Sequence, residues 1–349
     1  MLSKTTADAP AALTLNDVAQ RAGVSPMTVS NVINGKAGVR AATRQRVLDA
    51  ISETGYRVNP MARTLAGGRN RILSVLTPQM NQPYASEVVQ GAANAAQRLG
   101  YELIVMRSGG SNFSVMTQLA AGVLLIQPPP LPHRGDQDLR TDRLPPVVSV
   151  DGPSDHPFMV DNYGGACLAV QHLVGLGHTR IGFISGLEAE PGVAAEGAGA
   201  SSGQRNDAHE RFRGYRESLA SAGLPVLTEY VQHGDFTKES GERAAQHLLR
   251  LPRPPTALFV SGDAMALGAI HLAQDLGLHV PDDLSVVGFD DLPIAAAARP
   301  ALTTVRQPLQ EMGDRAIELL VELVEHRAVV CPAPFPTTLI QRDSTAACR

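Results

Sequence analysis

Two short helices joined by a tight turn are encoded near the amino end, and this motif limits what the chain can be more than any other feature. Thr14 is a residue type that caps helices, and Asp17 falls in the first turn, where a carboxylate interacts favourably with the helix dipole. Gly23 permits a sharp turn. Ser25 can cap a second helix in which Pro26 takes the first position, where a missing N–H is not costly.

The apolar residues of the two helices recur at the three- and four-residue spacing of a buried helical face. They are Val18, Ala19 and Ala22 in the first helix and Val29, Val32 and Ile33 in the second, with Val24 between the helices. The positions left facing outward are Pro26, Met27, Ser30 and Asn31. Because a helix-turn-helix presents its second helix to the DNA major groove, the pattern predicts a DNA-binding head.

Two further capped segments follow the motif. Ala42–Thr54 has the apolar spacing of a third helix, and Gly55 can end it in the left-handed conformation. Tyr56 comes next, and Asn59–Gly67 repeats the pattern of a cap followed by Pro at the first helical position. Two amphipathic helices around a glycine occur in many globular proteins, but this succession favours a three-helix head followed by a separate helix.

Charge is unevenly distributed along the 349 residues. Residues 1–71 contain ten Lys and Arg against four Asp and Glu, a net charge of +6, whereas residues 72–349 contain twenty against thirty, a net charge of −10. A basic head on an acidic body is suited to contact phosphate through the head alone. The length leaves about 270 residues for the body, which is enough for two lobes.

Nothing in the composition indicates secretion, a membrane span or a metal centre. Cys167, Cys331 and Cys348 lie far apart and lack paired spacing, which favours a reducing cytoplasm over a disulfide framework or a metal site. The amino end has one early Lys4 and no apolar core of signal-peptide length, and no apolar run reaches 18 residues. We expect a soluble cytoplasmic protein with no cofactor, no bound metal and no membrane partner.

Short apolar runs alternate with amphipathic stretches from Arg71 onward. The runs expected to form strands are Ile72–Thr77, Tyr101–Met106, Gly122–Gln127, Val147–Asp151, Arg180–Ser185, 230–234, Ala257–Ser261 and Leu284–Phe289. The stretches expected to form helices are Tyr84–Leu99, 163–176, 209–222, 237–249 and 263–276. This alternation predicts two parallel sheets in series, each covered by helices on both faces. Ligands of such folds bind beyond the carboxyl ends of the strands, here in a cleft between two lobes.

The chain from Thr14 to Ser344 closely resembles the lactose/galactose repressor (LacI/GalR) family of bacterial transcription regulators. The head carries the resemblance in Asp17–Ser25, Thr28–Asn34, Thr43–Arg44, Gly55–Tyr56 and Asn59–Ala66. The body carries it in Gly177–Ile181, Arg211–Tyr215, Gly234–Phe236, Gly262–Gly268, Ser285–Asp290 and Leu302–Gln307. Each motif is loose by itself, but their order and spacing together are highly specific.

This resemblance implies an all-α helix-turn-helix head joined by a hinge helix to an α/β body of two doubly wound parallel-sheet lobes, like a periplasmic sugar-binding protein with three crossovers. The implied domains are a disordered tail at 1–12, the head at 13–58, the hinge helix and linker at 59–70, and an effector-binding and dimerisation body at 71–345. Within the body, the N-lobe takes about 71–160 and 292–326, and the C-lobe about 161–291 and 327–345.

Sequence-specific repression of transcription is the activity that the resemblance implies. The residues expected to contact DNA are Thr14, Leu15, Pro26, Met27, Thr28, Ser30, Asn31, Asn34, Tyr56, Asn59, Ala62 and Leu65. Leu65 would wedge between base steps in the minor groove, unless it only packs against the body. A homodimer is expected, because the symmetry of an inverted-repeat operator mirrors that of the protein.

The expected effector site gathers polar residues at the strand ends. The position of four residues at expected strand ends suggests them: Tyr84, Asp151, Asp161 and Asn162. The resemblance implies three more: Arg211 matches an arginine of the family site, Phe236 an aromatic wall and Asp290 an acceptor carboxylate. Carboxylates and a guanidinium can each bind two hydroxyls while a ring covers an apolar sugar face. The alternative is that Arg211 and Asp290 form a structural ion pair and that Phe236 is part of the core.

These side chains are better suited to a neutral saccharide than to a strongly anionic effector. Ala85, directly after Tyr84, also lacks the second aromatic ring of the family's purine-binding members, which makes a nucleobase a less suitable ligand. The sequence is compatible with an effector that releases the operator and with one that strengthens its binding.

Two segments depart from the family pattern. Arg107–Leu119 is short for the helix expected there, and Ala121 replaces the usual acidic residue before the glycine, which puts a normal helix in doubt. Residues 187–207 are rich in Gly, Ala, Ser and Glu, and this composition predicts a mobile loop inserted beside the cleft. The loop could serve as a lid or only as a connection.

Two other protein classes share parts of this pattern. A solute-binding protein of the transport class would have a similar body, but with an export signal and no basic head. A sugar-metabolising enzyme on doubly wound sheets would need a catalytic constellation, and no phosphate loop, Ser/His/Asp set or HExxH motif is present. The sequence therefore favours a regulator without enzymatic activity, a repressor of carbohydrate-related genes.

Overall fold

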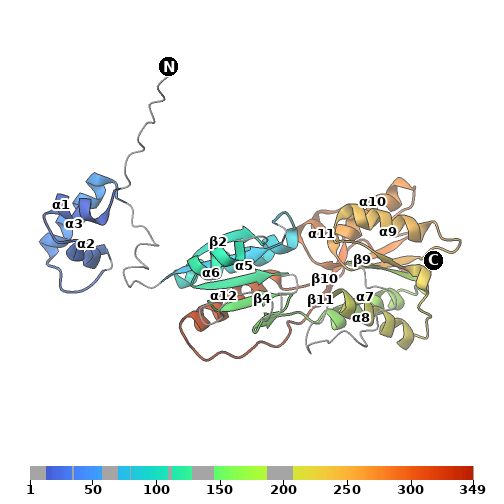
Figure 1. Cartoon of the computed structure of the whole chain (residues 1–349). Coiled ribbons are helices and arrows are strands. Elements are labelled where there is room, and N and C mark those ends of the chain that lie inside the picture. The colour runs from blue at the N-terminus through green and yellow to red at the C-terminus, as the bar shows by residue number, and fades with distance from the viewer. Residues whose placement is uncertain are drawn as a thin grey trace, which may run out of the picture. The chain divides into compact units, whose positions relative to one another are not determined.

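The computed structural model of the protein describes residues 13–33, 35–56, 70–78, 80–108, 112–127, 145–186 and 207–348. Two compact units divide the chain, Met1–Asn70 and Arg71–Arg349, and they are called the head and the body below (Figure 1). The expected tail at 1–12, the hinge helix at 59–67 and most of the insertion lie outside the described residues. Within the described part of the chain, no helix is long and apolar enough to cross a membrane.

The head is a three-helix unit around one small apolar core. Its helices are α1 (Leu15–Ala22), α2 (Pro26–Ile33) and α3 (Ala41–Thr54). Val18, Val29 and Val47, one from each helix, are fully buried. The turn between α1 and α2 passes through Gly23, whose φ of +63° is a conformation that glycine adopts without strain. The predicted helix-turn-helix is confirmed.

Two mainly parallel sheets form the body. The N-lobe sheet has the order β2-β1-β3-β4-β5, made of β1 (Ile72–Thr77), β2 (Glu102–Arg107), β3 (Gly122–Ile126), β4 (Val147–Val150) and β5 (Pro157–Phe158). The C-lobe sheet has the order β11-β10-β9-β8-β6-β7, made of β6 (Ile181–Ser185), β7 (Val231–His233), β8 (Ala257–Val260), β9 (Ser285–Asp290), β10 (Thr303–Arg306) and β11 (Thr338–Ile340). Among the described strands, only β11 pairs antiparallel with its neighbour. The predicted two-lobed α/β body is confirmed.

Helices cover both faces of the N-lobe sheet. Helices α5 (Pro83–Leu99) and α12 (Leu309–Val324) pack on one face, and α6 (Asn112–Leu119) packs on the other. Side chains of each strand alternate between the faces, so Leu73 and Val75 of β1 point toward α5 and α12, whereas Leu76 points toward α6. Burial on both faces is the reason that these strands read as continuous apolar runs.

The C-lobe sheet is covered in the same way (Figure 1). Helices α7 (Asn162–Gly175) and α8 (Asp207–Ser221) pack on one face, and α9 (Lys238–Leu249) and α10 (Asp263–Asp275) pack on the other. The short helix α11 (Pro293–Ala297) and a 3-10 turn at Thr228–Tyr230 lie in the connections. With the faces of both sheets covered, the strand ends are the part of the sheets left for a binding site.

Helix α6 is present where the short segment Arg107–Leu119 put a helix in doubt. Its eight residues, Asn112–Leu119, are few, but Met116 is 4% exposed and packs against Leu76 and Leu125. Most of the stability of a short helix comes from such packing rather than from its length, so the doubt about this helix was wrong.

Strand β10 corrects the expected boundary between the lobes. The sequence assigns 292–326 to the N-lobe, but Thr303–Arg306 pairs in parallel with β9 in the C-lobe sheet. A buried hydrogen bond from the Thr304 hydroxyl to Asp263 Oδ1 at 2.6 Å ties β10 to the start of α10. Within the expected segment, α12 does pack in the N-lobe.

Helix α12 packs on α5 at very short range. Gly91 of α5 lies against the backbone carbonyl of Gln310, so that a Cβ at this position would overlap with the oxygen, and Gly313 of α12 makes the matching contact with α5. Arg98 of α5 also forms a bidentate ion pair with Asp314, with both bonds at 2.8 Å. Arg98 and Asp314 are 216 positions apart in the sequence, so the N-lobe depends on a long-range contact.

Gly91→Ala should destabilise the body. The new methyl group must displace the carbonyl of Gln310, and overpacking of this kind costs about 1–3 kcal/mol. Gly175→Ala near the end of α7 is the control, because a Cβ there meets no atom within 4 Å, and it should leave stability unchanged or raise it by up to about 1 kcal/mol. Urea unfolding measures both variants, and equal stabilities would contradict the close crossing of α5 and α12.

Candidate functional site

Hydrogen bonds in the first turn fix the start of each helix of the helix-turn-helix. The carboxylate of Asp17 accepts hydrogen bonds from the backbone N–H of Thr14 at 2.7 Å and from its hydroxyl at 2.8 Å. The backbone bond is the main cause that lowers the pKa of Asp17. The Ser25 hydroxyl accepts a hydrogen bond from the backbone N–H of Thr28 at 3.2 Å. Both helix starts therefore lie where the sequence predicts them.

The far end of α2 is held by α3. Arg44 of α3 donates hydrogen bonds to the carbonyl oxygens of Val32 at 3.4 Å and Lys36 at 3.0 Å. These carbonyls lie at and just beyond the last turn of α2, where a helix leaves acceptors without a partner of its own. Because α2 is fixed at both ends, its outward face is held in a defined orientation.

That outward face contains five of the eight described residues that are predicted to contact DNA. They are Pro26 and Met27, which are exposed, and Thr28, Ser30 and Asn31, which are half-buried. Thr14 is exposed at the start of α1. The head therefore presents a mixed polar and apolar surface on one side of α2.

Leu15 and Tyr56 lie differently from the other predicted contacts. Both side chains are half-buried and pack against the head core. A contact between Leu15 and DNA would use its backbone N–H, since the N-terminus of a helix favours phosphate. The remaining predicted contacts, which lie outside the described residues, are Asn34, Asn59, Ala62 and Leu65.

Arg211 is the centre of a buried polar group in the body. Its Nε donates to Asn162 Oδ1 at 2.8 Å, and its Nη1 donates to the backbone carbonyl of Ser261 at 2.6 Å. Nη1 also lies 3.9 Å from Asp290 Oδ1, and Cζ lies 3.8 Å from the centroid of the Phe289 ring. The Arg211 side chain is only 4% exposed. It therefore joins α7, α8, β8 and β9 at one point.

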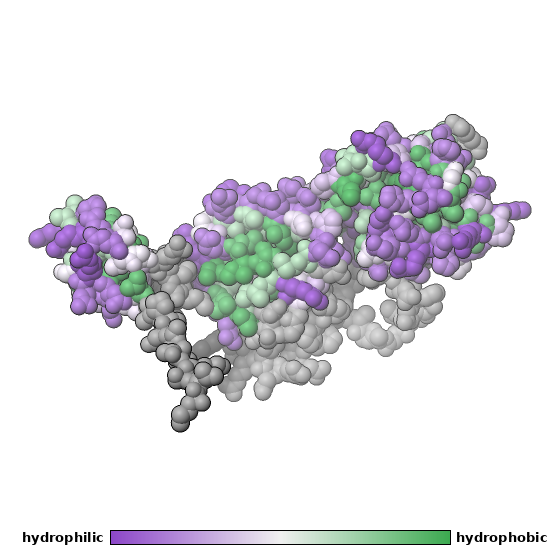
Figure 2. Space-filling model, turned by 90° about the horizontal axis from the view of Figure 1, so that it is seen from above, coloured by the Kyte–Doolittle hydropathy of each residue, from purple (hydrophilic) through white to green (hydrophobic). Residues whose placement is uncertain are grey.

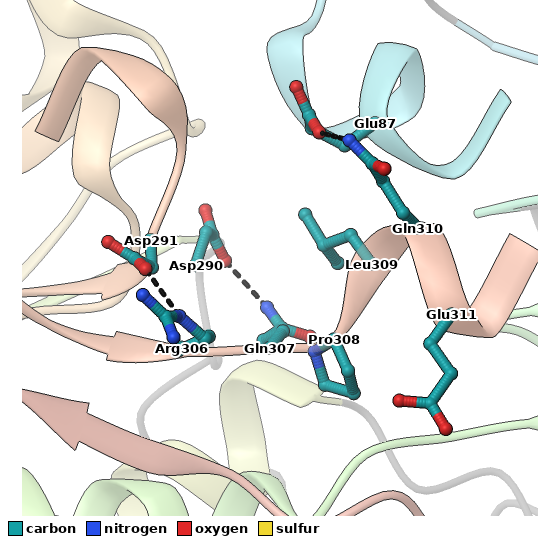
Figure 3. Close-up of a pocket in the computed structure, with 9 residues that line it drawn as sticks. All are labelled: Glu87, Asp290, Asp291, Arg306, Gln307, Pro308, Leu309, Gln310 and Glu311. Carbon is teal, nitrogen blue, oxygen red and sulfur yellow. Dashed lines mark hydrogen bonds and ion pairs between the residues drawn. The ribbon is translucent and has the colours of Figure 1, made fainter. Parts of the chain in front are cut away.

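Asp290 at the end of β9 receives a second partner from the segment after β10. Gln307 Nε2 donates to Asp290 Oδ1 at 2.6 Å, as Figure 3 shows. Burial raises the pKa of Asp290 to about 6, although Arg211 and Gln307 act to lower it. The ion pair between Arg211 and Asp290, given above as the alternative to an effector-binding role, is present, and it offsets only part of the cost of burying the carboxylate.

Two further carboxyl groups lie in the same region. Asp151 directly follows β4 of the N-lobe, and burial together with the charge of Asp207 raises its pKa well above the ordinary value. Asp207 opens α8 of the C-lobe, burial raises its pKa, and its Oδ1 accepts from Asn162 Nδ2 at 2.8 Å. Within the described residues, no group of three or more His, Cys, Asp or Glu side chains has a metal-binding arrangement. Asp151 of the N-lobe therefore lies within electrostatic range of Asp207 of the C-lobe.

The Phe236 ring lies beside this group and also packs against the apolar core that α9 and α10 form with the C-lobe sheet. The ring packs against Gly186 after β6, where a Cβ would overlap with it. A Cβ on Gly262 would lie 3.2 Å from the Phe236 ring and 3.7 Å from Asp290 Oδ2. The ring and the carboxylate therefore flank the same glycine, as a site with one apolar and one polar wall requires.

The backbone is unusual at the same strand ends. Of the six described residues other than glycine with positive φ, five end or follow a strand: Gln127, Asp151, Phe236, Asp290 and Asp291. Such conformations cost free energy and concentrate at ligand sites. Their positions point to the strand ends as the functional part of the body.

Buried polar atoms without a partner also collect there. Among the described residues, these atoms include Tyr84 OH after β1, Asp151 Oδ1 after β4, Ser261 Oγ after β8 and Gln307 Oε1 after β10. An unpaired buried polar atom costs free energy, so atoms of this kind at the strand ends are suited to a ligand that supplies the missing hydrogen bonds.

Asp161 and Asn162 are neighbours with different places in the structure. Asp161 is exposed and caps α7, since its Oδ1 accepts from the backbone N–H of Gly164 at 2.7 Å. Asn162 is 4% exposed and bridges Arg211 and Asp207. The structure brings Asn162, but not the Asp161 carboxylate, into the buried polar group.

An open pocket of about 190 Å³ lies beside Asp290 and Gln307. Figure 3 shows the residues that line it. Asp290 and Gln307 line it from the C-lobe side, and Leu309 and Glu87 line it from α12 and α5 of the N-lobe. Glu87 accepts a hydrogen bond from Gln310 Nε2 at 2.7 Å. Both lobes therefore contribute walls to the pocket.

Three residues of the group are missing from the sequence-based site: Asp207, Ser261 and Gln307. Asp207 falls in the segment interpreted as a loop, two residues before the expected start of its helix. Ser261 ends an expected strand, so its position alone could have marked it. Gln307 follows β10, a strand that the apolar pattern does not reveal.

Two family models match the chain. One describes bacterial regulatory proteins of the lacI family and matches residues 14–59, and the other describes the periplasmic binding protein-like domain and matches residues 170–345. The chain is 35% identical over 333 residues to the HTH-type transcriptional repressor CytR of Escherichia coli (strain K12), covering 91% of this chain and 92% of the relative.

Solved structures of regulators have the same fold. The Lac repressor dimer bound to operator and the anti-inducer ONPF matches with a TM-score of 0.79 and 28% identity, covering 96% of this chain and 99% of that chain. The complex of the transcriptional regulator CelR with cellobiose matches with a TM-score of 0.65 and 31% identity, covering 95% and 99%.

Asp290→Asn should change how the stability of the body depends on pH. The folded protein holds the Asp290 proton more tightly than the unfolded chain, in which the pKa is near 3.8, so this group lowers stability as pH rises. A folded pKa of about 6 implies a loss of about 1–2 kcal/mol between pH 5 and pH 7.5 from Asp290 alone. Burial lowers the pKa of His172 and of His178, which acts in the opposite direction, so the test compares variants rather than absolute stabilities.

Urea unfolding at pH 5 and pH 7.5 measures this difference. Between pH 5 and pH 7.5, the free energy of unfolding of the wild type should fall by about 1–2 kcal/mol more than that of Asp290→Asn. Asp275→Asn, which alters an exposed carboxylate at the end of α10, should behave like the wild type. The same pH response in Asp290→Asn and the wild type would contradict the raised pKa.

Proposed function

Since the chain belongs to the lacI family of bacterial regulatory proteins, we propose that it acts as a homodimeric repressor of carbohydrate-related genes. The head binds an inverted-repeat operator, and a saccharide in the cleft between the lobes controls that binding. The observation that carries the proposal is the buried polar group around Arg211, where unpaired hydrogen-bonding atoms of both lobes gather at the strand ends.

A ligand rich in hydroxyl groups suits this arrangement. Asp151, Asp290 and Gln307 offer acceptor oxygens, and the hydroxyl of Ser261 can donate or accept. The Phe236 ring can cover the apolar face of a sugar ring. The complex of the similar regulator CelR with cellobiose supports a saccharide as the class of effector.

Control of DNA binding follows from a ligand held by both lobes. Asp151 belongs to the N-lobe, whereas Arg211 and Asp290 belong to the C-lobe. The lobes can adopt an arrangement in which these three residues are close together and one in which they are farther apart. A ligand that bonds to all three has a higher affinity for the first arrangement and therefore favours it. In a dimer, this arrangement sets the spacing of the two heads.

An exposed apolar surface of the N-lobe is suited to hold two copies together. Figure 2 shows apolar side chains gathered on one face of this lobe. Ile104 on the edge strand β2 is 36% exposed, and Val115 on α6 is 42% exposed. Contiguous exposed apolar surface commonly marks an interface, and the similar Lac repressor was solved as a dimer bound to operator.

Asn31 and Met27 are the side chains of α2 that we assign to base recognition. The amide of Asn31 matches the N6 and N7 pattern of adenine, and the apolar Met27, which is 68% exposed, can contact the methyl group of thymine. Half-sites of the operator should then have an A·T pair facing Asn31. Thr14 and Tyr56 would contact phosphate, and Leu65 of the hinge segment would enter the minor groove at a flexible central step.

Arg211→Ala should abolish the response to the effector while operator binding persists. The substitution removes the cation that orients the carbonyl of Ser261 and the amide of Asn162. Thermal-shift screening of sugars with the full-length protein identifies a ligand, and fluorescence anisotropy on the DNA upstream of its own gene measures its effect on operator binding.

Two controls accompany this experiment. Arg243→Ala removes an exposed arginine of α9 and should respond like the wild type. A body fragment without residues 1–70 should bind the sugar but not the operator. A normal response of Arg211→Ala to the identified sugar would show that the effector site lies elsewhere.

Asn31→Ala should weaken binding to the preferred operator by about 1–3 kcal/mol and remove base preference at one position of each half-site. Lys36→Ala, which removes an exposed cation just beyond α2, should weaken binding to all sequences alike and make it less dependent on salt. Selection of binding sites from random DNA with both variants and the wild type tests this. If Asn31 contacts only phosphate, its variant will behave like Lys36→Ala, and the assignment to base recognition is refuted.

A further inference from the structure

The turn after β9 has an unusual backbone at two consecutive residues. Asp290 has a φ of +120°, and Asp291 has a φ of +59°. A φ near +57° belongs to the left-handed region that Asp tolerates, whereas +120° lies outside the regions that residues other than glycine commonly adopt. Such a conformation persists only where the surrounding structure holds it. The turn that carries the Asp290 carboxylate therefore needs fixed partners.

Hydrogen bonds to three other elements hold this turn. Asp291 Oδ2 accepts from Arg306 Nε at 2.6 Å, and Asp291 Oδ1 accepts from Arg342 Nη2 at 2.6 Å. The next residue, Leu292, donates its backbone N–H to Asp263 Oδ2 at 2.7 Å. The turn is thus bound to the end of β10, to the segment after β11 and to the start of α10.

The two neighbouring carboxylates have different partners. Asp290 Oδ1 accepts from Gln307 Nε2 at 2.6 Å and lies 3.9 Å from Arg211 Nη1. Both oxygens of Asp291 accept from arginines instead, and Figure 3 shows the bond from Arg306. Asp291 also lines the pocket beside Asp290, but its side chain is only 7% exposed. Asp291 is therefore placed to support its neighbour rather than to contact a ligand.

Arg342 is the firmer of the two partners of Asp291. Its side chain is 17% exposed, and its Nη1 donates a further hydrogen bond to the carbonyl oxygen of Leu302 at 2.8 Å. The Arg306 side chain is 52% exposed, and an ion pair open to water contributes little. Among the described residues, Arg306 lines the pocket and Arg342 does not. Loss of the Arg342 side chain therefore removes support from Asp291 without removing a wall of the pocket.

We propose, building on the function proposed above, that Asp291 and Arg342 are positioning residues of the effector site. Their ion pair holds the strained turn so that the Asp290 carboxylate faces Arg211, Gln307 and the sugar. Because the carboxylate is held in this orientation before the sugar arrives, no free energy is lost in ordering it on binding. The affinity for the effector thus depends on an ion pair that does not touch it.

The unliganded protein provides the first test, with Arg342→Met. In this variant the turn can relax and the Asp290 carboxyl can reach water, so its pKa should fall from about 6 toward the ordinary value. A carboxyl whose pKa is raised by folding lowers stability as pH rises, so a smaller shift means a smaller loss. Urea unfolding should therefore show a smaller loss of stability between pH 5 and pH 7.5 than in the wild type. Arginine stays charged at both pH values, so the substitution itself removes no titrating group.

Two further variants accompany this measurement. Arg243→Met, which alters an exposed arginine of α9, should keep the pH response of the wild type. If Arg342→Met does not fold, Arg342→Gln, which loses the charge but keeps a donor, should show the same change to a smaller extent. A wild-type pH response in the folded Arg342 variant overturns the proposal.

Sugar binding provides the second test. The probes are cellobiose, lactose, D-glucose and D-galactose, titrated by calorimetry into the full-length protein at pH 7. Each sugar that binds the wild type should bind Arg342→Met at least tenfold more weakly, and Arg342→Lys, which keeps a cation, should recover most of the affinity. Arg306→Met should lose less affinity than Arg342→Met. Adding Asp291→Asn to Arg342→Met should cause no further loss, because both substitutions break the same ion pair.

The outcomes separate this proposal from the function on which it rests. Wild-type sugar affinity in Arg342→Met overturns the positioning role, and a larger loss in Arg306→Met than in Arg342→Met does so too, since it indicates direct contact with the sugar. The proposed function stands in both cases. If none of the four sugars binds the wild type, the result counts against a saccharide effector, and the pH response of Arg342→Met decides the positioning role.

Discussion

A single buried guanidinium holds the ligand-facing part of the body together. Arg211 is 4% exposed, and removing its charge from water is costly. The hydrogen bonds to Asn162 and to the carbonyl of Ser261, the stacking on Phe289 and the nearby Asp290 offset that cost. Because Arg211 lies on α8 and its partners lie on α7, just after β8 and on β9, none of these elements can move without leaving a buried charge less well paired.

A buried carboxyl group at the start of α10 also fixes elements around the cleft. Asp263 is fully buried, burial raises its pKa well above the ordinary value, and it accepts hydrogen bonds from Thr304 of β10 and the backbone of Leu292. It therefore holds the strand end at which Asp290 and Gln307 lie. Strained backbone and unpaired polar atoms can persist at the cleft because the hydrogen bonds of Arg211 and Asp263 fix the surrounding elements.

Local sequence predicts the parts of this protein that are determined locally. The caps at Thr14 and Ser25 and the alternation of strands and helices depend on nearest neighbours, and so the head and the two sheets could be inferred. Strand β10 owes its place to a partner strand and to a buried bond from Thr304 to Asp263, which no local pattern encodes. Asp207 and Gln307 join the cleft for the same reason, because tertiary packing brings them to Asn162 and Asp290.

The crossing of α5 and α12 affects the order in which parts of the protein can fold as it is made. Translation delivers α5 early, but its packing partner α12 begins only at Leu309, after the strands β6–β10 of the C-lobe sheet. The head has its core within residues 13–56 and can fold as it leaves the ribosome, as domains generally do. The apolar face of α5 must wait for α12, so the N-lobe cannot close until most of the C-lobe has been made, although its first strands are encoded before those of the C-lobe.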